Sequence, residues 1–221
     1  NRTGPGGGVL QSSASDSTHL IHVVARERAM AGQSQRPAFV AYTSAQAHSS
    51  VEKGARVACI EHFRAIDVDK NLSLDPVALQ AAITADREAG LTPLIVTSCL
   101  GTTGTAAIDP IAAIAKITSD EGLWHHVDAA YGGSAMICPE QRHLQEGAAT
   151  ADSFTFNPHK WMFTNFDCNV LYVADRTSLI DAMSITPPYL KNAASESGKV
   201  IDYRDWRSEE HTSELQSHLN L

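Results

Sequence analysis

The chain has 221 residues, a formal net charge of -8 and 43% hydrophobic residues, a length and composition that suit one domain with a buried core. The acidic charge without a basic stripe argues against a nucleic-acid-binding protein, and no apolar run reaches the roughly 18 residues of a membrane span. The 4 cysteines show no CxxC spacing, so neither a zinc site nor a disulfide framework is indicated, and we expect a reducing, cytoplasmic compartment.

The first predicted helix covers residues 14–32 and follows a glycine-rich run at residues 4–8. Two later helices are predicted over residues 76–89 and 111–121, because each has an Asp-Pro pair before it and a glycine directly after it. An aspartate at the N-cap, a proline in the first turn and a glycine at the C-terminal end are the residues that helix ends favour.

Short apolar runs alternate with these helices and are predicted to be strands. They lie at residues 38–43, 94–99, 123–127, 153–156 and 169–173, with weaker candidates at 57–60 and 65–68. Strands that alternate with helices predict parallel crossover connections. The sequence therefore predicts an α/β fold of three layers, in which a mostly parallel sheet carries helices on both faces.

The C-terminal end of the sequence differs from the rest. Residues 207–221 change character abruptly, and their first part reads like a translated sequencing adapter, so we interpret this segment as a non-native tail. The alternative is a polar C-terminal helix, since Leu215 and Leu219 lie four residues apart. We expect residues 1–206 to be part of one large domain, and the chain to be an internal piece of a longer protein.

Chemically active side chains follow the predicted strands. Open α/β sheets bind ligands just beyond the carboxyl ends of their strands. The side chains that these ends deliver are His48, Thr102, Thr103, Asp128, His159 and Lys160. We therefore expect a carboxylate, an amine, imidazoles and hydroxyls to converge on one rim of the sheet.

Asp128 closes an apolar strand, where a carboxylate is costly to bury unless a cationic group meets it. The alternative is a structural carboxylate that caps a backbone turn. The small residues that follow, Ala129, Ala130, Gly132 and Gly133, are expected to leave space for a flat ligand.

Lys160 lies between His159 and Trp161, shortly after the aromatic run at 153–156. Most lysines are solvated surface residues. These neighbours instead predict an apolar pocket, which lowers the pKa of an amine and prepares it for Schiff-base chemistry.

The lysine and the acid together suggest pyridoxal phosphate, a cofactor that needs a lysine for its aldehyde, an acid for its pyridine nitrogen and an anion site for its phosphate. The Gly/Ser run at residues 6–15 leads into a helix whose free N–H groups favour a phosphate, although such a run is also an ordinary linker and helix cap. His48 suits stacking on the ring and assisting proton transfer, although a lone histidine is more often structural.

At this point the sequence resembles a known family, the group II pyridoxal-phosphate decarboxylases, with the aromatic-L-amino-acid decarboxylase branch as the nearest match. The resemblance covers residues 6–206. The motifs that carry it are GGGV at 6–9, QAHSS at 46–50, LGTT at 100–103, HVDAAY at 126–131 and NPHKW at 157–161. It implies pyridoxal phosphate as cofactor and an incomplete large domain of the fold-type I enzymes.

The resemblance also implies roles for particular residues. Lys160 is the lysine that binds the cofactor aldehyde, and Asp128 is the partner of the pyridine nitrogen. His48 and Ala130 contact the two faces of the ring. The remaining implied residues are Ala14, Ser15, Asn157 and Ser13 at the phosphate, Thr103 and His159 beside the cofactor and its lysine, and Tyr189 as a proton donor on a mobile catalytic loop.

By resemblance, the protein converts an L-amino acid, expected to be aromatic, to its amine and carbon dioxide as a homodimer. One alternative is an aromatic aldehyde synthase, which follows decarboxylation with oxidative deamination. That activity goes with phenylalanine in place of Tyr189 or asparagine in place of His48, so this chain favours simple decarboxylation. The other alternative is an inactive fragment or binding-only homologue, and we expect the 221-residue chain alone to be inactive. The amino acid itself is not identified by the sequence.

Overall fold

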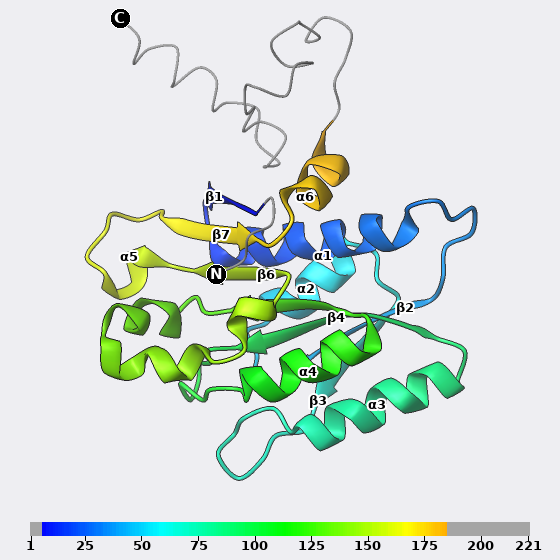
Figure 1. Ribbon diagram of the computed structural model, residues 1–221, viewed down its shortest axis with the longest axis horizontal. Coiled ribbons are helices and arrows are strands. Elements are labelled where there is room, and N and C mark those ends of the chain that lie inside the picture. The colour runs from blue at the N-terminus through cyan, green and yellow to red at the C-terminus, as the bar shows by residue number, and fades with distance from the viewer. Residues whose placement is uncertain (1–5, 185–221) are drawn as a thin grey trace, which may run out of the picture.

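A 7-stranded sheet forms the centre of the structure, with the strand order β1-β7-β6-β5-β4-β2-β3 (Figure 1). The structure is a computed structural model that describes residues 6–184, so Tyr189 and the tail at 207–221 lie outside the described residues. The strands are β1 (Gly7–Gln11), β2 (Phe39–Ser44), β3 (His62–Ile66), β4 (Thr92–Cys99), β5 (Trp124–Asp128), β6 (Ser153–Phe156) and β7 (Asn169–Val173).

Helices connect most of these strands. The α-helices are α1 (Ala14–Met30), α2 (Ser50–Val57), α3 (Pro76–Glu88), α4 (Ile111–Glu121), α5 (Pro158–Trp161) and α6 (Arg176–Met183). Three 3-10 helices, η1 (Gly132–Ile137), η2 (Pro139–Gln145) and η3 (Ala148–Thr150), fill the connection from β5 to β6. Among the described residues, no helix is long and apolar enough to cross a membrane.

The sheet is parallel from β3 through β2, β4 and β5 to β6, and β7 and β1 add an antiparallel edge. The prediction of a mostly parallel sheet is confirmed. The antiparallel edge follows from the short connection between β6 and β7, which contains only the one-turn helix α5 and cannot make a parallel crossover. The glycines in β1 concealed this strand from the sequence analysis, because glycine disfavours strands.

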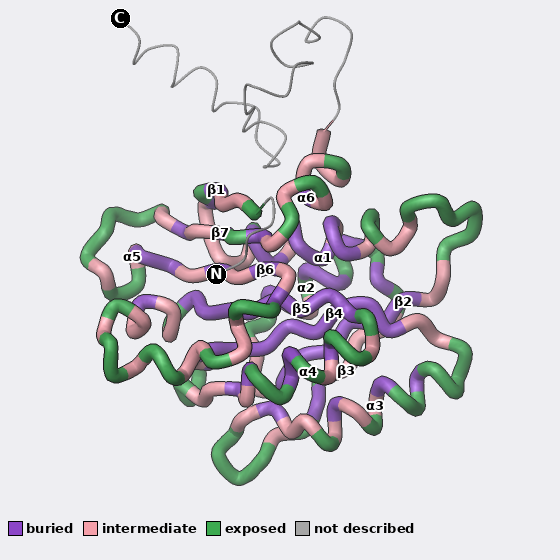
Figure 2. Tube along the Cα trace, viewed as in Figure 1, coloured by how far each residue is buried: buried purple, intermediate pink, exposed green. Residues whose placement is uncertain are grey.

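The helices cover both faces of the sheet, so the three-layer prediction is also confirmed (Figure 1). Helices α1, α2 and α6 pack on one face, where Ile21 and Val24 of α1 meet Phe39 of β2 in one core cluster. Helices α3 and α4 pack on the other, where Leu79 and Ile114 belong to a second cluster. Figure 2 shows the strands between the layers as mostly buried.

Three details of the predicted elements are wrong. Residues 57–60 are not a strand but the end of α2 and the turn after it, and β3 is His62–Ile66 rather than 65–68. This strand lies at the edge of the sheet with mostly half-buried residues, so it lacks a clear apolar run. Helix α1 ends at Met30, two residues before the predicted end.

The predicted helix caps are correct for α3 and only partly correct for α4. Asp75 caps α3 by accepting the N–H of Val77, and Gly122 ends α4 with a left-handed φ of 69°. Asp109 does not cap α4. Its buried carboxylate instead accepts the backbone N–H groups of Cys99 and Leu74, and so ties the end of β4 to a neighbouring loop.

Candidate active site

The carboxyl ends of four neighbouring parallel strands meet at one rim of the sheet. The register aligns Thr43 of β2 with Thr97 of β4, and Asp128 of β5 with both Cys99 of β4 and Thr155 of β6. The segments that follow these ends carry the candidate residues, and α5 lies at this rim on the left of Figure 1. The predicted convergence is therefore supported by the strand order and register.

Asp128 is the buried acid of this rim, with 7% of its surface exposed. Its Oδ1 accepts the backbone N–H of Ala130 at 3.0 Å, and within residues 6–184 no group donates a hydrogen bond to its Oδ2. Burial raises the pKa of Asp128, and the hydrogen bond from Ala130 and the electrostatic influence of Lys160 and His48 act in the opposite direction. Asp128 therefore caps a turn with one oxygen, its other oxygen has no donor among the described residues, and it lies within electrostatic reach of Lys160.

The sequence analysis expected the glycines after Asp128 to leave space for a ligand, but both are in close contact with neighbouring residues. A Cβ on Gly132 would lie 2.3 Å from the carbonyl oxygen of Leu100, and one on Gly133 would lie 2.4 Å from Cβ of Phe156. These glycines instead allow the segment after β5 to pack closely on the ends of β4 and β6. This close packing fixes the backbone that follows Asp128.

Lys160 lies on the short helix α5, whose proline occupies the first turn and whose N-cap is Asn157. Its backbone N–H donates to the carbonyl of Asn157, and its side chain is exposed. Trp161 is also 44% exposed and stacks on Tyr131 with ring centroids 5.4 Å apart. The expectation of an apolar pocket around Lys160 is therefore wrong for the described residues, because its aromatic neighbours lie on the rim.

His48 lies in the exposed turn between β2 and α2. The backbone N–H of Ser50 donates to its Nδ1 at 3.2 Å, and the hydroxyl of Ser50 lies 2.9 Å from the same atom. Because Nδ1 accepts a backbone N–H, the neutral ring carries its proton on Nε2. Ser50 thus holds the ring through Nδ1, and Nε2 is the nitrogen that this contact does not use.

Two further candidates lie near Lys160 and β4. His159 accepts the backbone N–H of Cys168 at its Nδ1, 2.8 Å away, and its ring centroid is 4.4 Å from that of Phe166. Thr103 lies in the exposed loop after β4. Its neighbour Thr102 is buried and accepts the N–H of Ala107, so Thr102 holds the loop and Thr103 faces outward.

The predicted anion site lies at the start of α1. Ser13 caps the helix by accepting the N–H of Asp16 and also donates its hydroxyl to the Asp16 carboxylate. Ser13 is therefore occupied as a helix cap. Ala14 and Ser15 are the first two residues of the helix, and their N–H groups have no partner within it.

One buried residue at the site was missed by the sequence analysis. Asn169, the first residue of β7, is fully buried and hydrogen-bonds to α1, to β6 and to Asn157. The signal in the sequence was an amide at the start of an apolar strand. Its partners lie in α1 and at residues 155–157, both distant or separate from β7 in the sequence, so the pattern alone did not show what it bonds.

The residues of this rim fit pyridoxal phosphate. They provide a primary amine, a buried carboxylate with one oxygen unpaired among the described residues, and a helix start with unbonded N–H groups. These are the groups that the aldehyde, the pyridine nitrogen and the phosphate of this cofactor require.

Comparisons with known proteins identify a family and several relatives of the chain. The family described as "Pyridoxal-dependent decarboxylase conserved domain" matches residues 1–211. Phenylacetaldehyde synthase of Arabidopsis thaliana is 45% identical over 92% of this chain and 43% of its own length. Aromatic-L-amino-acid decarboxylase of Mus musculus is 44% identical over 93% of this chain and 45% of its own length.

A solved structure, that of Oryza sativa TDC with PLP and tryptamine, superposes with a TM-score of 0.88. It is 39% identical, and the match covers 94% of this chain and 44% of that one. The chain thus spans less than half the length of the relatives it matches.

Proposed function

The chain belongs to the pyridoxal-dependent decarboxylase family, and from this premise we propose that the complete protein decarboxylates an aromatic L-amino acid to its amine and carbon dioxide. The observation that carries the proposal is the buried carboxylate of Asp128, with an unpaired Oδ2 within electrostatic reach of Lys160. The relatives of the chain include an aromatic-L-amino-acid decarboxylase, which supports the aromatic substrate class.

Pyridoxal phosphate, when bound, supplies the electron sink that decarboxylation requires. Lys160 binds its aldehyde, and Asp128 holds a proton on the ring nitrogen, an interaction that strengthens where water is excluded. The N–H groups of Ala14 and Ser15 bind the phosphate at the positive end of α1.

The other proposed residues surround these three groups. His48 and Ala130 contact the two faces of the ring, and His48 is the residue that relays a proton through Nε2. The proposed neighbours of the phosphate and of Lys160 are Asn157, Ser13, Thr103 and His159.

Tyr189 lies outside the described residues, and we propose that its hydroxyl protonates the substrate carbon after carbon dioxide leaves.

The second candidate function is an aromatic aldehyde synthase, which the likeness to Phenylacetaldehyde synthase of Arabidopsis thaliana favours. Retention of both Tyr189 and His48 supports the decarboxylase over the synthase.

The products of the complete protein separate the two functions. With an aromatic L-amino acid we expect amine and carbon dioxide. With Tyr189→Phe in the presence of dissolved oxygen, the oxidant, we expect less amine together with aldehyde, ammonia and hydrogen peroxide. Tyr172→Phe is the matched control, because Tyr172 is a half-exposed residue on β7. Aldehyde and peroxide in equal amounts from the unaltered protein would replace the decarboxylase with the synthase.

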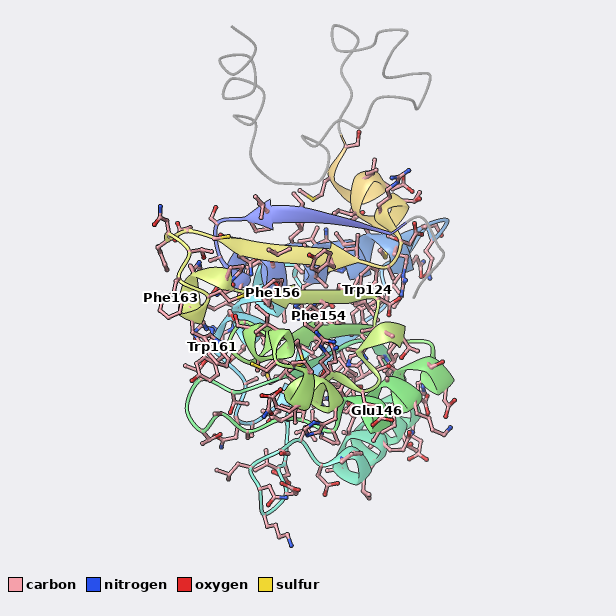
Figure 3. The ribbon with its side chains drawn as sticks, turned by 60° about the vertical axis from the view of Figure 1, so that its left-hand side comes forward. Trp124, Glu146, Phe154, Phe156, Trp161 and Phe163 are labelled. Atoms are coloured by element: carbon pink, nitrogen blue, oxygen red, sulfur yellow. The ribbon has the colours of Figure 1, made fainter. Side chains whose placement is uncertain are left out.

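We also propose that two copies of the protein assemble, with the rim as part of the interface. Trp161, Phe163, Phe166 and Tyr131 are exposed around Lys160, and Phe163 has 103% of its reference surface exposed. Figure 3 shows Trp161 and Phe163 at the edge of the molecule beside α5. Exposed apolar clusters of this kind mark interfaces, and a second copy covering them would supply the apolar pocket that Lys160 lacks.

Sedimentation of the complete protein tests this assembly. We expect a dimer, and Phe163→Asp is expected to shift it towards the monomer, whereas Val77→Asp on the exposed side of α3 is not. A monomeric protein with full activity would refute the proposed interface.

For the isolated 221-residue chain, which spans part of the enzyme only, we expect no activity. We propose a cytoplasmic compartment, since all 4 cysteines are free in the structure.

A further inference from the structure

Asn169 is a buried amide in a strand that is otherwise apolar on its inner face. It is 0% exposed, and the next inward residues of β7, Leu171 and Val173, belong to the core cluster under α1. A buried amide is costly unless its donors and acceptors are bonded. Its hydrogen bonds therefore show what this residue holds together.

The side chain of Asn169 bonds two segments that are far apart in the sequence, the start of α1 and residues 155–157. Its Oδ1 accepts the hydroxyl of Ser17 at 2.5 Å, on the first turns of α1. Its Nδ2 donates to the carbonyl of Phe156 at 3.0 Å, at the end of β6. Nδ2 also donates to Oδ1 of Asn157 at 2.5 Å, and Oγ1 of Thr155 lies 2.8 Å from the same Nδ2.

The bonds to Ser17 and Asn157 join the two parts of the proposed phosphate site. Ser17 lies two residues after Ser15, whose N–H is free at the helix start. Asn157 is the N-cap of α5, the helix that carries Lys160. The side chain of Asn169 therefore links the start of α1 to Asn157, and through Asn157 to α5, which carries Lys160.

The bond to Asn157 also fixes the orientation of that amide. Because Oδ1 of Asn157 accepts from Asn169, the Nδ2 of Asn157 faces away from Asn169, and within residues 6–184 it donates to no group. Asn157 thus keeps a free donor at a buried position. Without the donor from Asn169, the amide of Asn157 is free to turn its acceptor to the anion instead.

We propose that Asn169 is a positioning residue, which aligns Asn157 and the start of α1 so that both donate to the phosphate of the cofactor. This inference rests on the proposed function, because it assumes that a pyridoxal cofactor binds at the rim. Asn169 does not itself touch the cofactor. A purely structural asparagine would affect stability alone, whereas a positioning residue affects the recognition of the phosphate in particular.

The test compares the binding of pyridoxal phosphate with that of pyridoxal, which lacks the phosphate, to the complete apoprotein. The readout is the dissociation constant of each compound, followed by cofactor absorption. For Asn169→Leu we expect the constant for pyridoxal phosphate to rise about tenfold, the usual effect of losing a hydrogen bond or two. The constant for pyridoxal is expected to stay within about twofold.

Ser17→Ala breaks the same link from the side of α1 and removes only one hydroxyl. It is expected to lower the preference for pyridoxal phosphate in the same direction, so it decides the question if Asn169→Leu does not fold. The matched control is Thr118→Val, a buried hydroxyl on α4 in the opposite layer, where a change in stability with an unchanged preference is expected.

Equal weakening of both compounds in Ser17→Ala and Asn169→Leu would overturn the proposal, as would no weakening of either. These outcomes differ from failure of the proposed function. If the unaltered protein bound neither compound, the cofactor assignment itself would be wrong.

Discussion

Buried histidines between α1 and the sheet make the stability of this protein depend on pH. Burial lowers the pKa of His22 on α1 to about 4, although a hydrogen bond from its Nδ1 to the carbonyl of Thr18 acts in the opposite direction. Burial likewise lowers the pKa of His126 on β5 to about 3, and His22 lowers it further. Burial also lowers the pKa of His125 to about 4, although the side chain of this residue points to the opposite face of the sheet, where it contacts Ser98 of β4.

The direction of the effect follows from these shifts. A histidine whose pKa is lowered in the folded state binds protons more readily when the chain unfolds. Its contribution to stability is complete above the unfolded pKa of 6.5 and is lost as the pH falls from 6.5 to about 4. For His22 this shift corresponds to about 3 kcal/mol in total, of which about 2 kcal/mol is lost by pH 5.

The assay is urea unfolding of the complete protein at pH 7.5 and at pH 5. For His22→Gln, which cannot titrate in this range, we expect the difference in unfolding free energy between the two pH values to shrink by about 2 kcal/mol. His143→Gln is the matched control, because His143 is exposed on η2. If His22→Gln and the unaltered protein lost the same stability on acidification, the argument from burial would be refuted.

Two further predictions concern the acid of the site and a buried hydroxyl. Asp128→Asn removes the charge that we propose to meet the ring nitrogen, so cofactor affinity is expected to fall about tenfold or more in a titration of the apoprotein. Unchanged affinity would remove Asp128 from the site. Tyr42→Phe removes the bond from the Tyr42 hydroxyl to Asp86, 2.8 Å long, and is expected to cost about 1–2 kcal/mol of unfolding free energy at unchanged cofactor affinity. A neutral effect in urea unfolding would show that Arg64, which also bonds Asp86, satisfies that carboxylate alone.

The parts of the fold that could be predicted are those set by local patterns. Buried central strands such as β4 and β5 have continuous apolar runs, and the ends of α3 have recognisable caps. Since the strands are parallel, the residues after them had to meet at one rim. The edge strands β1 and β3 escaped for the opposite reason, because glycine and half-exposed positions leave no apolar run.

The parts of the site that could not be predicted depend on contacts between distant segments. The surroundings of Lys160 were inferred from its aromatic neighbours in the sequence, but in the folded chain Trp161 turns to Tyr131 and leaves the lysine exposed. Gly132 allows a close contact with the carbonyl of Leu100 rather than leaving space for a ligand. The hydrogen bonds of Asn169 likewise join α1 to the residues between β6 and α5, and no spacing in the sequence encodes this contact.

The measurement that tests the central assignment most directly is chemical trapping of the cofactor. The complete protein, loaded with pyridoxal phosphate, is reduced with borohydride and digested, and the peptide that carries the cofactor mass is identified. We expect the added mass on Lys160, and no stable labelling in Lys160→Ala. A label on another lysine in the unaltered protein, with Lys160 unmodified, would contradict the account.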